Sequence, residues 1–306
     1  MTEVQVLAPR EVPLGGLRAL TVRRTLPHRD RSFIGAWCFV DHYGPARVGV
    51  DSPPMDVAPH PHTGLQTVSW LFEGEIEHRD SGGVHEMVRP GEVNLMTGGS
   101  GICHSEVSTP STSTLHGVQL WVALPSSALD APRAFDHYAA PSVQVPGATM
   151  RVFLGSLLGS SSPVTTHTPL LGAELVLEPS AVLEVPVDSS FEHGVLLDTG
   201  SVSVSGVALE VGALGCVDAG TSSLALTAGP SGARIILLGG PPFDEEIVMW
   251  WNFVGRTHED VAAARADWEA SSDRFGSVSG YVGERARIPA PELPGVRLKP
   301  RGRRGR

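Results

Sequence analysis

The chain contains 306 residues, about twice the usual length of one domain, so two domains with separate cores are predicted. Its 33 acidic and 23 basic residues give a net charge of −10, and the body of the protein should therefore repel nucleic acid. The sequence lacks both the roughly 18 apolar residues of a membrane span and the basic, apolar start of a signal peptide, which predicts a cytoplasmic protein.

The composition predicts a chain built from short strands. Its 35 glycines and 25 prolines favour turns, and long helical periodicities are scarce. The three cysteines, Cys38, Cys103 and Cys216, are odd in number, far apart and without C-x-x-C spacing, which indicates neither a disulfide framework nor a thiolate zinc site. An all-β protein of a reducing compartment is expected.

Two strand-rich segments follow one another along the chain. Residues 18–124 and 171–243 both consist of short apolar runs separated by turns, and residues 125–142 between them resemble a connector. The two segments are also similar to each other, because stretches match in the same order: 68–80 with 195–206, and 88–99 with 209–220. This weak similarity indicates a repeated barrel unit.

The sequence therefore predicts three parts: an N-terminal barrel at 1–135, a C-terminal barrel with a terminal helix at 136–290, and a basic tail at 291–306. The helix is predicted because Thr257 and Asp260 form a capping-box pattern. In the residues that follow, Val261, Ala264 and Trp268 can share one face. We expect that face to pack on a barrel.

The tail concentrates positive charge in the sequence GVRLKPRGRRGR. Without its six basic residues the rest of the chain has 17 basic and 33 acidic residues, a balance of −16. A contact with an anionic partner is one interpretation of this pattern. A disordered, solvated end is the other and is the one we expect, so no function is assigned to the tail.

The first candidate site lies in the sequence APHPHTG, which contains His60 and His62. On an extended segment this spacing directs both imidazoles to one side. Pro59 and Pro61 favour extended geometry and remove amide donors, which predicts an edge strand or the mouth of a barrel.

About 40 residues later the sequence GICHSEV repeats the spacing with His104 and Glu106. Two extended segments of this kind can converge as three imidazoles and one carboxylate. This set suits Fe(II), Mn(II), Ni(II), Cu(II) or Zn(II), and it leaves coordination positions open for chemistry. The alternative is that these are ordinary surface or core polar residues. A metal site made of His60, His62, His104 and Glu106 is predicted because the pattern occurs twice.

The runs RDRSFIGAWCFVDHYGP, APHPHTGLQTVSWLFEGEIEHRDS and RPGEVNLMTGGSGICHSE closely resemble the pirin family of the cupin superfamily, over residues 24–276. The resemblance implies two stacked cupin barrels of the double-stranded β-helix, or jelly-roll, type. It also implies iron in the N-terminal barrel, held by the H-P-H histidines and the H-x-E pair, all four of which are present here. The C-terminal barrel lacks this set, because Glu192 and His193 should point to opposite faces, and it is expected to be free of metal.

Several other polar residues have two interpretations. Gln66 replaces the glutamate of the wider cupin pattern, and it either orients a ligand or packs in the structure. His42 and His116 either line the cavity or make structural hydrogen bonds. Cys103 should face away from the metal as a buried apolar side chain. His167 and His193 are expected to be ordinary histidines.

The resemblance implies two functions of different classes. One is a quercetin 2,3-dioxygenase that cleaves planar flavonols with O₂, with Glu106 as the base that accepts the 3-hydroxyl proton. The other is an iron- or redox-responsive adaptor that regulates a transcription factor or metabolic enzyme. The intact ligand set favours the oxidoreductase, with Fe(II) as the expected ion and a monomer as the expected state. Four aromatic residues near the motifs either flank a planar substrate or belong to the core: Trp37, Phe39, Trp70 and Phe72.

Overall fold

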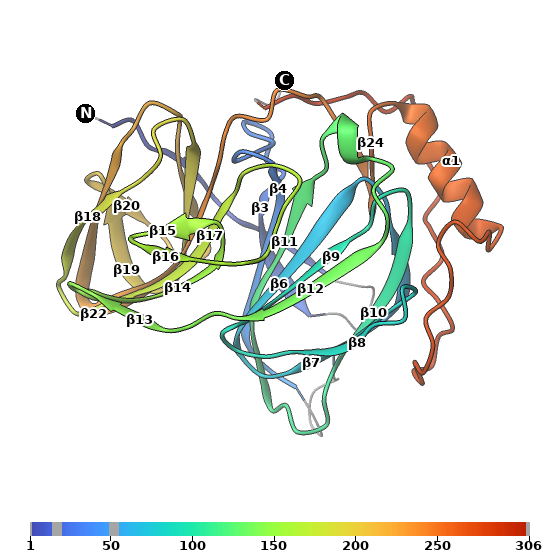
Figure 1. Ribbon diagram of the computed structural model, residues 1–306, viewed down its shortest axis with the longest axis horizontal. Coiled ribbons are helices and arrows are strands. Elements are labelled where there is room, and N and C mark those ends of the chain that lie inside the picture. The colour runs from blue at the N-terminus through green and yellow to red at the C-terminus, as the bar shows by residue number, and fades with distance from the viewer. Residues whose placement is uncertain (1, 14–19, 49–54, 304–306) are drawn as a thin grey trace.

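The computed structural model describes residues 2–13, 20–48 and 55–303. Two β-barrels stand side by side in it, and one α-helix lies on the outer side of the N-terminal barrel (Figure 1). The prediction of an all-β protein with two cupin barrels and a short C-terminal helix is therefore confirmed. Among the described residues, no helix is long and apolar enough to cross a membrane.

The N-terminal barrel is formed by two facing sheets. The larger sheet contains, in spatial order, β12 (Ala134–Ala139), β9 (Glu92–Thr97), β6 (Leu65–Glu73), β11 (Thr114–Ala123), β4 (Trp37–Arg47), β3 (Thr21–Leu26) and β2 (Arg10–Pro13). The smaller sheet contains β5 (Asp56–His62), β10 (Ile102–Ser108), β7 (Ile76–Asp80) and β8 (His85–Val88). The strands of both sheets pair in antiparallel fashion, as expected for strands joined by short turns.

The C-terminal barrel is formed by a nine-stranded sheet. Its main path contains β1 (Gln5–Leu7), β21 (Leu214–Val217), β19 (Glu192–Val204), β22 (Ser223–Gly240), β17 (Leu171–Leu177), β14 (Ala148–Leu154) and β13 (Val143–Val145). Two further strands pair with the long strands, β18 (Val182–Pro186) with β22 and β20 (Val207–Leu209) with β19. The interior of this barrel is aliphatic, with Leu175, Leu197 and Ile235 among its buried side chains.

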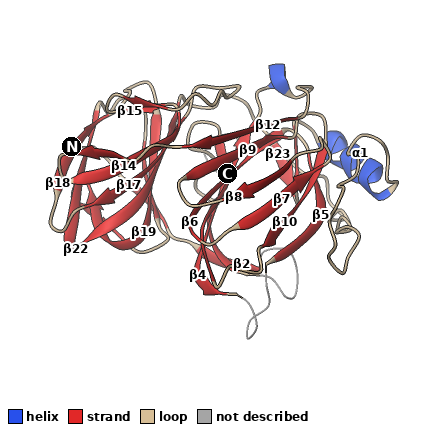
Figure 2. Ribbon diagram, turned by 60° about the horizontal axis from the view of Figure 1, so that its bottom comes forward, coloured by secondary structure: helices blue, strands red, loops and turns tan. Residues whose placement is uncertain are grey.

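The remaining elements are short. They are the 3₁₀ turn η1 (Ser126–Ala128), the pair β15 (Ser156–Leu157) and β16 (Ser160–Ser161), the pair β23 (Val248–Trp250) and β24 (Phe253–Gly255), and the helix α1 (His258–Glu269). Thr257 and Asp260 form the expected capping box, since the Thr257 hydroxyl accepts from the Asp260 amide and the Asp260 carboxylate accepts from the Thr257 amide. Val261, Ala264 and Trp268 are buried, as predicted. Figure 2 shows α1 beside the strands of the N-terminal barrel.

The outer face of the larger N-terminal sheet packs against the C-terminal barrel. Trp37 Nε1 donates to the carbonyl of Gly239 at 3.1 Å, and Trp70 Nε1 donates to Glu174 at 3.1 Å. The Trp70 ring also stacks on Phe153, with centroids 4.7 Å apart. A single apolar core thus runs from one barrel into the other and fixes their arrangement.

The expected boundaries at residues 135 and 290 stay a prediction, but backbone pairing crosses both, the second through the bridge between Ile247 and Arg301. Strand β1 pairs with β21 of the C-terminal barrel, whereas β12 continues to Ala139 and pairs with β9 of the N-terminal barrel. Phe253 of β24 bridges to Thr63, so the segment after the second barrel returns to the first. Such pairings link residues far apart in sequence, which a local pattern does not reveal.

The basic tail makes contacts as far as Arg303, and the disordered end expected from its composition stays a prediction. Arg297 forms an ion pair with Glu259, the Arg301 backbone bridges to Ile247, and Arg303 reaches Glu192 at 2.9 Å. The two acidic partners lie on α1 and on β19 of the C-terminal barrel, far from the tail in sequence, so the composition of the tail alone does not reveal them. Arg304 and Arg306 lie outside the described residues.

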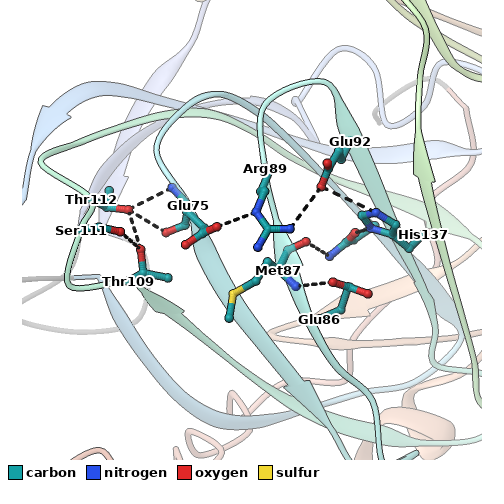
Figure 3. Close-up of polar contacts among 10 residues, drawn as sticks. Glu75, Glu86, Met87, Arg89, Glu92, Thr109, Ser111, Thr112 and His137 are labelled. Atoms are coloured by element: carbon teal, nitrogen blue, oxygen red, sulfur yellow. Dashed lines mark hydrogen bonds and ion pairs between the residues drawn. The ribbon is translucent and has the colours of Figure 1, made fainter.

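A polar network around Glu75, Arg89 and Glu92 links strands of the N-terminal barrel (Figure 3). Arg89 donates to Glu75 at 2.6 Å, and Glu92 lies near both Arg89 and His137. Since Glu75 precedes β7, Arg89 precedes β9 and His137 lies on β12, the network joins elements of both sheets. It holds the barrel without contributing to the cavity.

Candidate metal centre

The predicted ligand residues lie on two neighbouring strands of the smaller sheet. In the antiparallel pair β5 and β10, His104 is opposite His60 and Ile102 is opposite His62. Alternation along β5 directs His60 and His62 to the same side, and the pairing brings His104 to that side as well. A register shift between His104 and Glu106 displaces the carboxylate along the strand, so that it pairs near Val57.

The three imidazoles converge inside the barrel. One nitrogen from each of His60, His62 and His104 lies within 4.8 Å of the others, and the Nε2 atoms of His62 and His104 are 3.0 Å apart. All three side chains are buried. Their lone pairs therefore face a common point that is shielded from bulk water.

The protonation of these histidines fits a metal ion. Burial lowers the pKa of His60 to about 4 and lowers the pKa values of His62 and His104 well below the usual range. His60 Nδ1 lies 3.0 Å from the carbonyl of Ala58, so this nitrogen carries the proton and donates it. Nε2 is left as a free ligand atom. Neutral imidazoles in this state are the form that binds transition metals.

Glu106 lies on the wall of the same cavity, beside His104 rather than within the three-histidine cluster. Its ligand atom groups within 4.8 Å of His104 and His78, and Ser69 Oγ lies 3.4 Å from Glu106 Oε1. Burial raises the pKa of Glu106, although His78 and Ser69 oppose the rise. The structure thus brings the three predicted histidines together and places Glu106 next to one of them, His104. The complete four-residue ligand set stays a prediction.

Sequence reasoning missed His78, which supports His104 from behind. His78 Nδ1 lies 3.3 Å from His104 Nδ1, and His78 Nε2 lies 3.4 Å from Asp80 Oδ2. In this arrangement His104 Nδ1 donates to His78, and His78 Nε2 donates to Asp80. These two hydrogen bonds orient Nε2 of His104 toward the cluster. The alternation in IEHRD, with Ile76, His78 and Asp80 on one buried face, is the signal that could have revealed it.

The cluster lies in a cavity of about 630 Å³ with an aromatic wall. Phe39 and Trp121 line it and stack with ring centroids 3.9 Å apart, and Trp121 meets the His62 ring edge-on. Of the four aromatic residues expected near the site, only Phe39 lines this cavity. Trp37, Trp70 and Phe72 face the C-terminal barrel instead. Trp121 and Trp251, which also line it, were not singled out from the sequence.

The residues with two interpretations now have defined surroundings. Gln66 is buried and donates to Thr97, so it packs in the sheet and does not line the cavity. Cys103 is buried against Phe275 and the helix, as expected. Glu192 and His193 point to opposite faces, as expected, but His193 is fully buried without a hydrogen-bond partner among the described residues.

His42 and His116 make hydrogen bonds between the barrels rather than lining the cavity. Both place Nε2 near Asp198 Oδ1 of β19, at 2.7 and 2.5 Å. Burial opposes ionisation of Asp198, but the hydrogen bonds from His116 and His42 outweigh it and hold the pKa of Asp198 below its usual range. Arg23 Nε donates to His42 Nδ1 at 3.2 Å, which fixes the proton of His42 on Nε2. A metal ion would need that nitrogen unprotonated, so we interpret this cluster as a hydrogen-bonded contact between the barrels.

Two barrels of this topology, with a histidine cluster enclosed in the first, define a cupin protein with two barrels. The family models give the particular family. Residues 19–122 match pirin, and residues 172–276 match the pirin C-terminal cupin domain. The chain belongs to the pirin family.

Individual relatives agree with this assignment. A Pseudomonas aeruginosa protein provisionally named quercetin 2,3-dioxygenase is 42% identical over 95% of this chain and 91% of its own length. A pirin-like protein of Caulobacter vibrioides is 35% identical over 81% of this chain and 88% of its own length. The crystal structure of a protein named quercetin 2,3-dioxygenase from Acinetobacter baumannii matches with a TM-score of 0.90 and 38% identity. That match covers 99% of this chain and 98% of the other.

Proposed function

We propose that this protein is a metal-dependent dioxygenase that cleaves flavonols such as quercetin with O₂. The observation that carries the proposal is the convergence of three neutral, buried imidazoles in a cavity of about 630 Å³ that also contains Glu106. An enclosed ligand set beside a carboxylate and an aromatic wall is suited to a planar chelating substrate. The names of the Pseudomonas and Acinetobacter relatives support the same activity.

His60, His62, His104 and Glu106 would hold the metal, with Fe(II) as the proposed ion. Mn(II), Ni(II), Cu(II) and Zn(II) suit the same donor atoms, and the choice among them depends on geometry and supply. A bound transition metal would supply a Lewis acid for the 3-hydroxyl and 4-carbonyl oxygens and an electron path to O₂. His78 and Asp80 keep His104 oriented toward this point.

The side chains around the cluster bind and deprotonate the substrate. Glu106 accepts the proton of the flavonol 3-hydroxyl, a role that its buried position and raised pKa favour. Ser69, which also lies 2.9 Å from Gln119 Oε1, positions the carboxylate. The stacked pair Phe39 and Trp121 provides a flat surface for the rings and excludes water from the reacting atoms.

The test is flavonol turnover by the metal-replete protein. Quercetin should be consumed with O₂ in equal amounts, a chelator should abolish the reaction, and adding back a single metal should restore it. An oxygen electrode and the loss of flavonol absorbance measure both quantities. If protein loaded with reduced iron and with each of the other four metals consumes no flavonol, the dioxygenase is wrong and a regulatory adaptor with a protein partner becomes the better hypothesis.

The proposal also includes the setting expected from the sequence, a cytoplasmic monomer in a reducing compartment. Sedimentation of the purified protein measures its oligomeric state, and fractionation of the source cells measures its location.

A further inference from the structure

Three arginines surround the cavity that contains the metal centre. Arg10 of β2, Arg24 of β3 and Arg285 of the segment after α1 line it, and Glu106 is the only acidic residue among its described lining residues. The chain as a whole carries a net charge of −10, so this concentration of positive charge is local. A metal ion in the cluster would add to it.

The charges of the three arginines are not equally compensated. Arg24 forms a two-pronged ion pair with Asp41, with both distances 2.7 Å, and its guanidinium lies 4.2 Å from the centre of the Phe39 ring. Arg10 donates to the carbonyl of Pro27, which is uncharged. Among the described residues, neither Arg10 nor Arg285 has an ion-pair partner, and both are exposed enough to meet a ligand at the cavity mouth.

Cationic neighbours crowd Arg10. Burial lowers the pKa of Arg10, and the positive charges of Arg24 and Arg301 lower it further, while Asp41 opposes them. Arg301 is brought near by the backbone bridge between Arg301 and Ile247. That bridge lies next to β23, whose Met249 lines the cavity. The basic tail thus contributes to the positive potential at this mouth.

The acidic groups on the same elements do not cancel this charge. Glu11 is adjacent to Arg10 on β2, and Glu284 is adjacent to Arg285, but neither lines the cavity. Alternation along β2 directs Glu11 and Arg10 to opposite faces. The cavity therefore combines an aromatic wall, formed by Phe39 and Trp121, with two guanidinium groups at its mouth that have no ion-pair partner among the described residues.

We propose that the cavity selects planar aromatic ligands that carry a negative group, such as a carboxylate or sulfonate, and that Arg10 and Arg285 bind this group. The guanidinium fork matches the paired oxygens of such anions. The aromatic part of the ligand lies against Phe39 and Trp121. The proposal rests on the dioxygenase only for the placement of the chelating end at the metal. It assigns a substrate class more acidic than a neutral flavonol.

The test compares quercetin with quercetin-5′-sulfonate, which adds one fixed charge and keeps the same chelating oxygens. Binding is measured without O₂ on the metal-replete protein, at a pH where the phenols are protonated. The sulfonate should bind more tightly at low salt, and the advantage should shrink at high salt. Exposed ion pairs are each worth up to about fivefold in affinity, so the ratio should fall by up to about 25-fold in the Arg10→Gln, Arg285→Gln double variant.

Arg29→Gln is the matched control, because Arg29 is 86% exposed and does not line the cavity. It removes one of the two positive charges that the double variant removes, at a site away from the cavity, and should leave the affinity ratio unchanged. An equal affinity for the two flavonols, or an unchanged ratio in the double variant, would overturn the proposal.

Naphthalene-2-sulfonate tests the anion site independently of the proposed dioxygenase activity, because it is a planar anion without a chelating oxygen pair. Its affinity should fall in the double variant and stay constant in Arg29→Gln, whether or not any flavonol is turned over. Unchanged affinity in the double variant, or no measurable binding to the parent at low salt, would show that the arginines do not form an anion site.

Discussion

His60 and His104 face each other directly across the β5–β10 pair, and each supplies one nitrogen to the three-histidine cluster. We predict about one transition metal per chain in the parent, all of it in the N-terminal barrel. His60→Ala or His104→Ala should empty the site, as measured by elemental analysis. The control is His85→Ala on β8, a half-exposed residue outside the cavity. Full occupancy in either ligand variant, or two metals in the parent, would contradict the assignment.

Glu106 separates metal binding from turnover. Glu106→Gln keeps the size of the side chain but removes its charge and most of its basicity. We expect metal to be held more weakly yet detectably by three imidazoles, while flavonol turnover falls by roughly 10² to 10⁴, the contribution of a positioned base. Metal content and kcat are measured on the same loaded sample. Parental kcat in that sample would mean that another group takes the proton.

The residues of the site differ in how readily their sequence reveals them. His60, His62 and His104 were predictable because spacing along a strand determines which side chains share a face. His78 and Trp121 were missed because their roles depend on which strands become neighbours. His78 meets His104 only through the β7–β10 pairing, and Trp121 meets Phe39 only through β4–β11. Register between distant strands is a property of the folded chain.

At the scale of the elements, residues 297–303 of the tail contact the helix α1, the residue before β23 and the C-terminal barrel. Deleting residues 297–306 removes the pairs of Arg297 with Glu259 and of Arg303 with the buried Glu192. We predict unchanged metal content, because none of these contacts reaches the histidine cluster, together with a lower Tm. Elemental analysis and thermal unfolding measure the two quantities. Loss of metal on deletion, or an unaltered Tm, would refute this account of the tail.

The elements that local patterns predict well are those with local causes. The capping box at Thr257 and the buried face of α1 follow from residues within one or two helical turns. The positions of β1, β12 and the tail do not follow from local residues, because each of these segments pairs with a segment that is distant in the sequence. The fold class was therefore predictable, whereas the exchange of segments between the barrels was not.

At the scale of the whole molecule, the burial of His42 between the two barrels makes stability depend on pH. Burial lowers the pKa of His42, and Arg23 on β3 adds to the lowering against the hydrogen bond to Asp198. His116 on β11 and Arg234 on β22 face the same carboxylate. Neutral His42 therefore stabilises the folded state fully above its usual pKa of about 6.5, and this contribution is lost as the pH falls below that value.

We predict that the free energy of unfolding falls between pH 7.5 and 5, with a slope of up to about 1.4 kcal/mol per pH unit for each proton taken up. Urea unfolding at a series of pH values measures it. His42→Gln keeps an Nε2 donor for Asp198 but cannot be protonated, so its slope should be shallower than that of the parent. Parallel slopes for the two proteins would exclude His42 as the source.

The pairing of Gln5 with Cys216 has a consequence for how the protein is made. Strand β1 is synthesised before either barrel. The edge of β21 with which it pairs is synthesised more than 200 residues later. The N-terminal barrel can form in the meantime, while β1 must wait as an unpaired strand that other chains could capture. Arg303, which follows every strand of both barrels in the sequence, then reaches Glu192. The C-terminal barrel is thus completed by segments that lie far before and far after its own strands in the sequence.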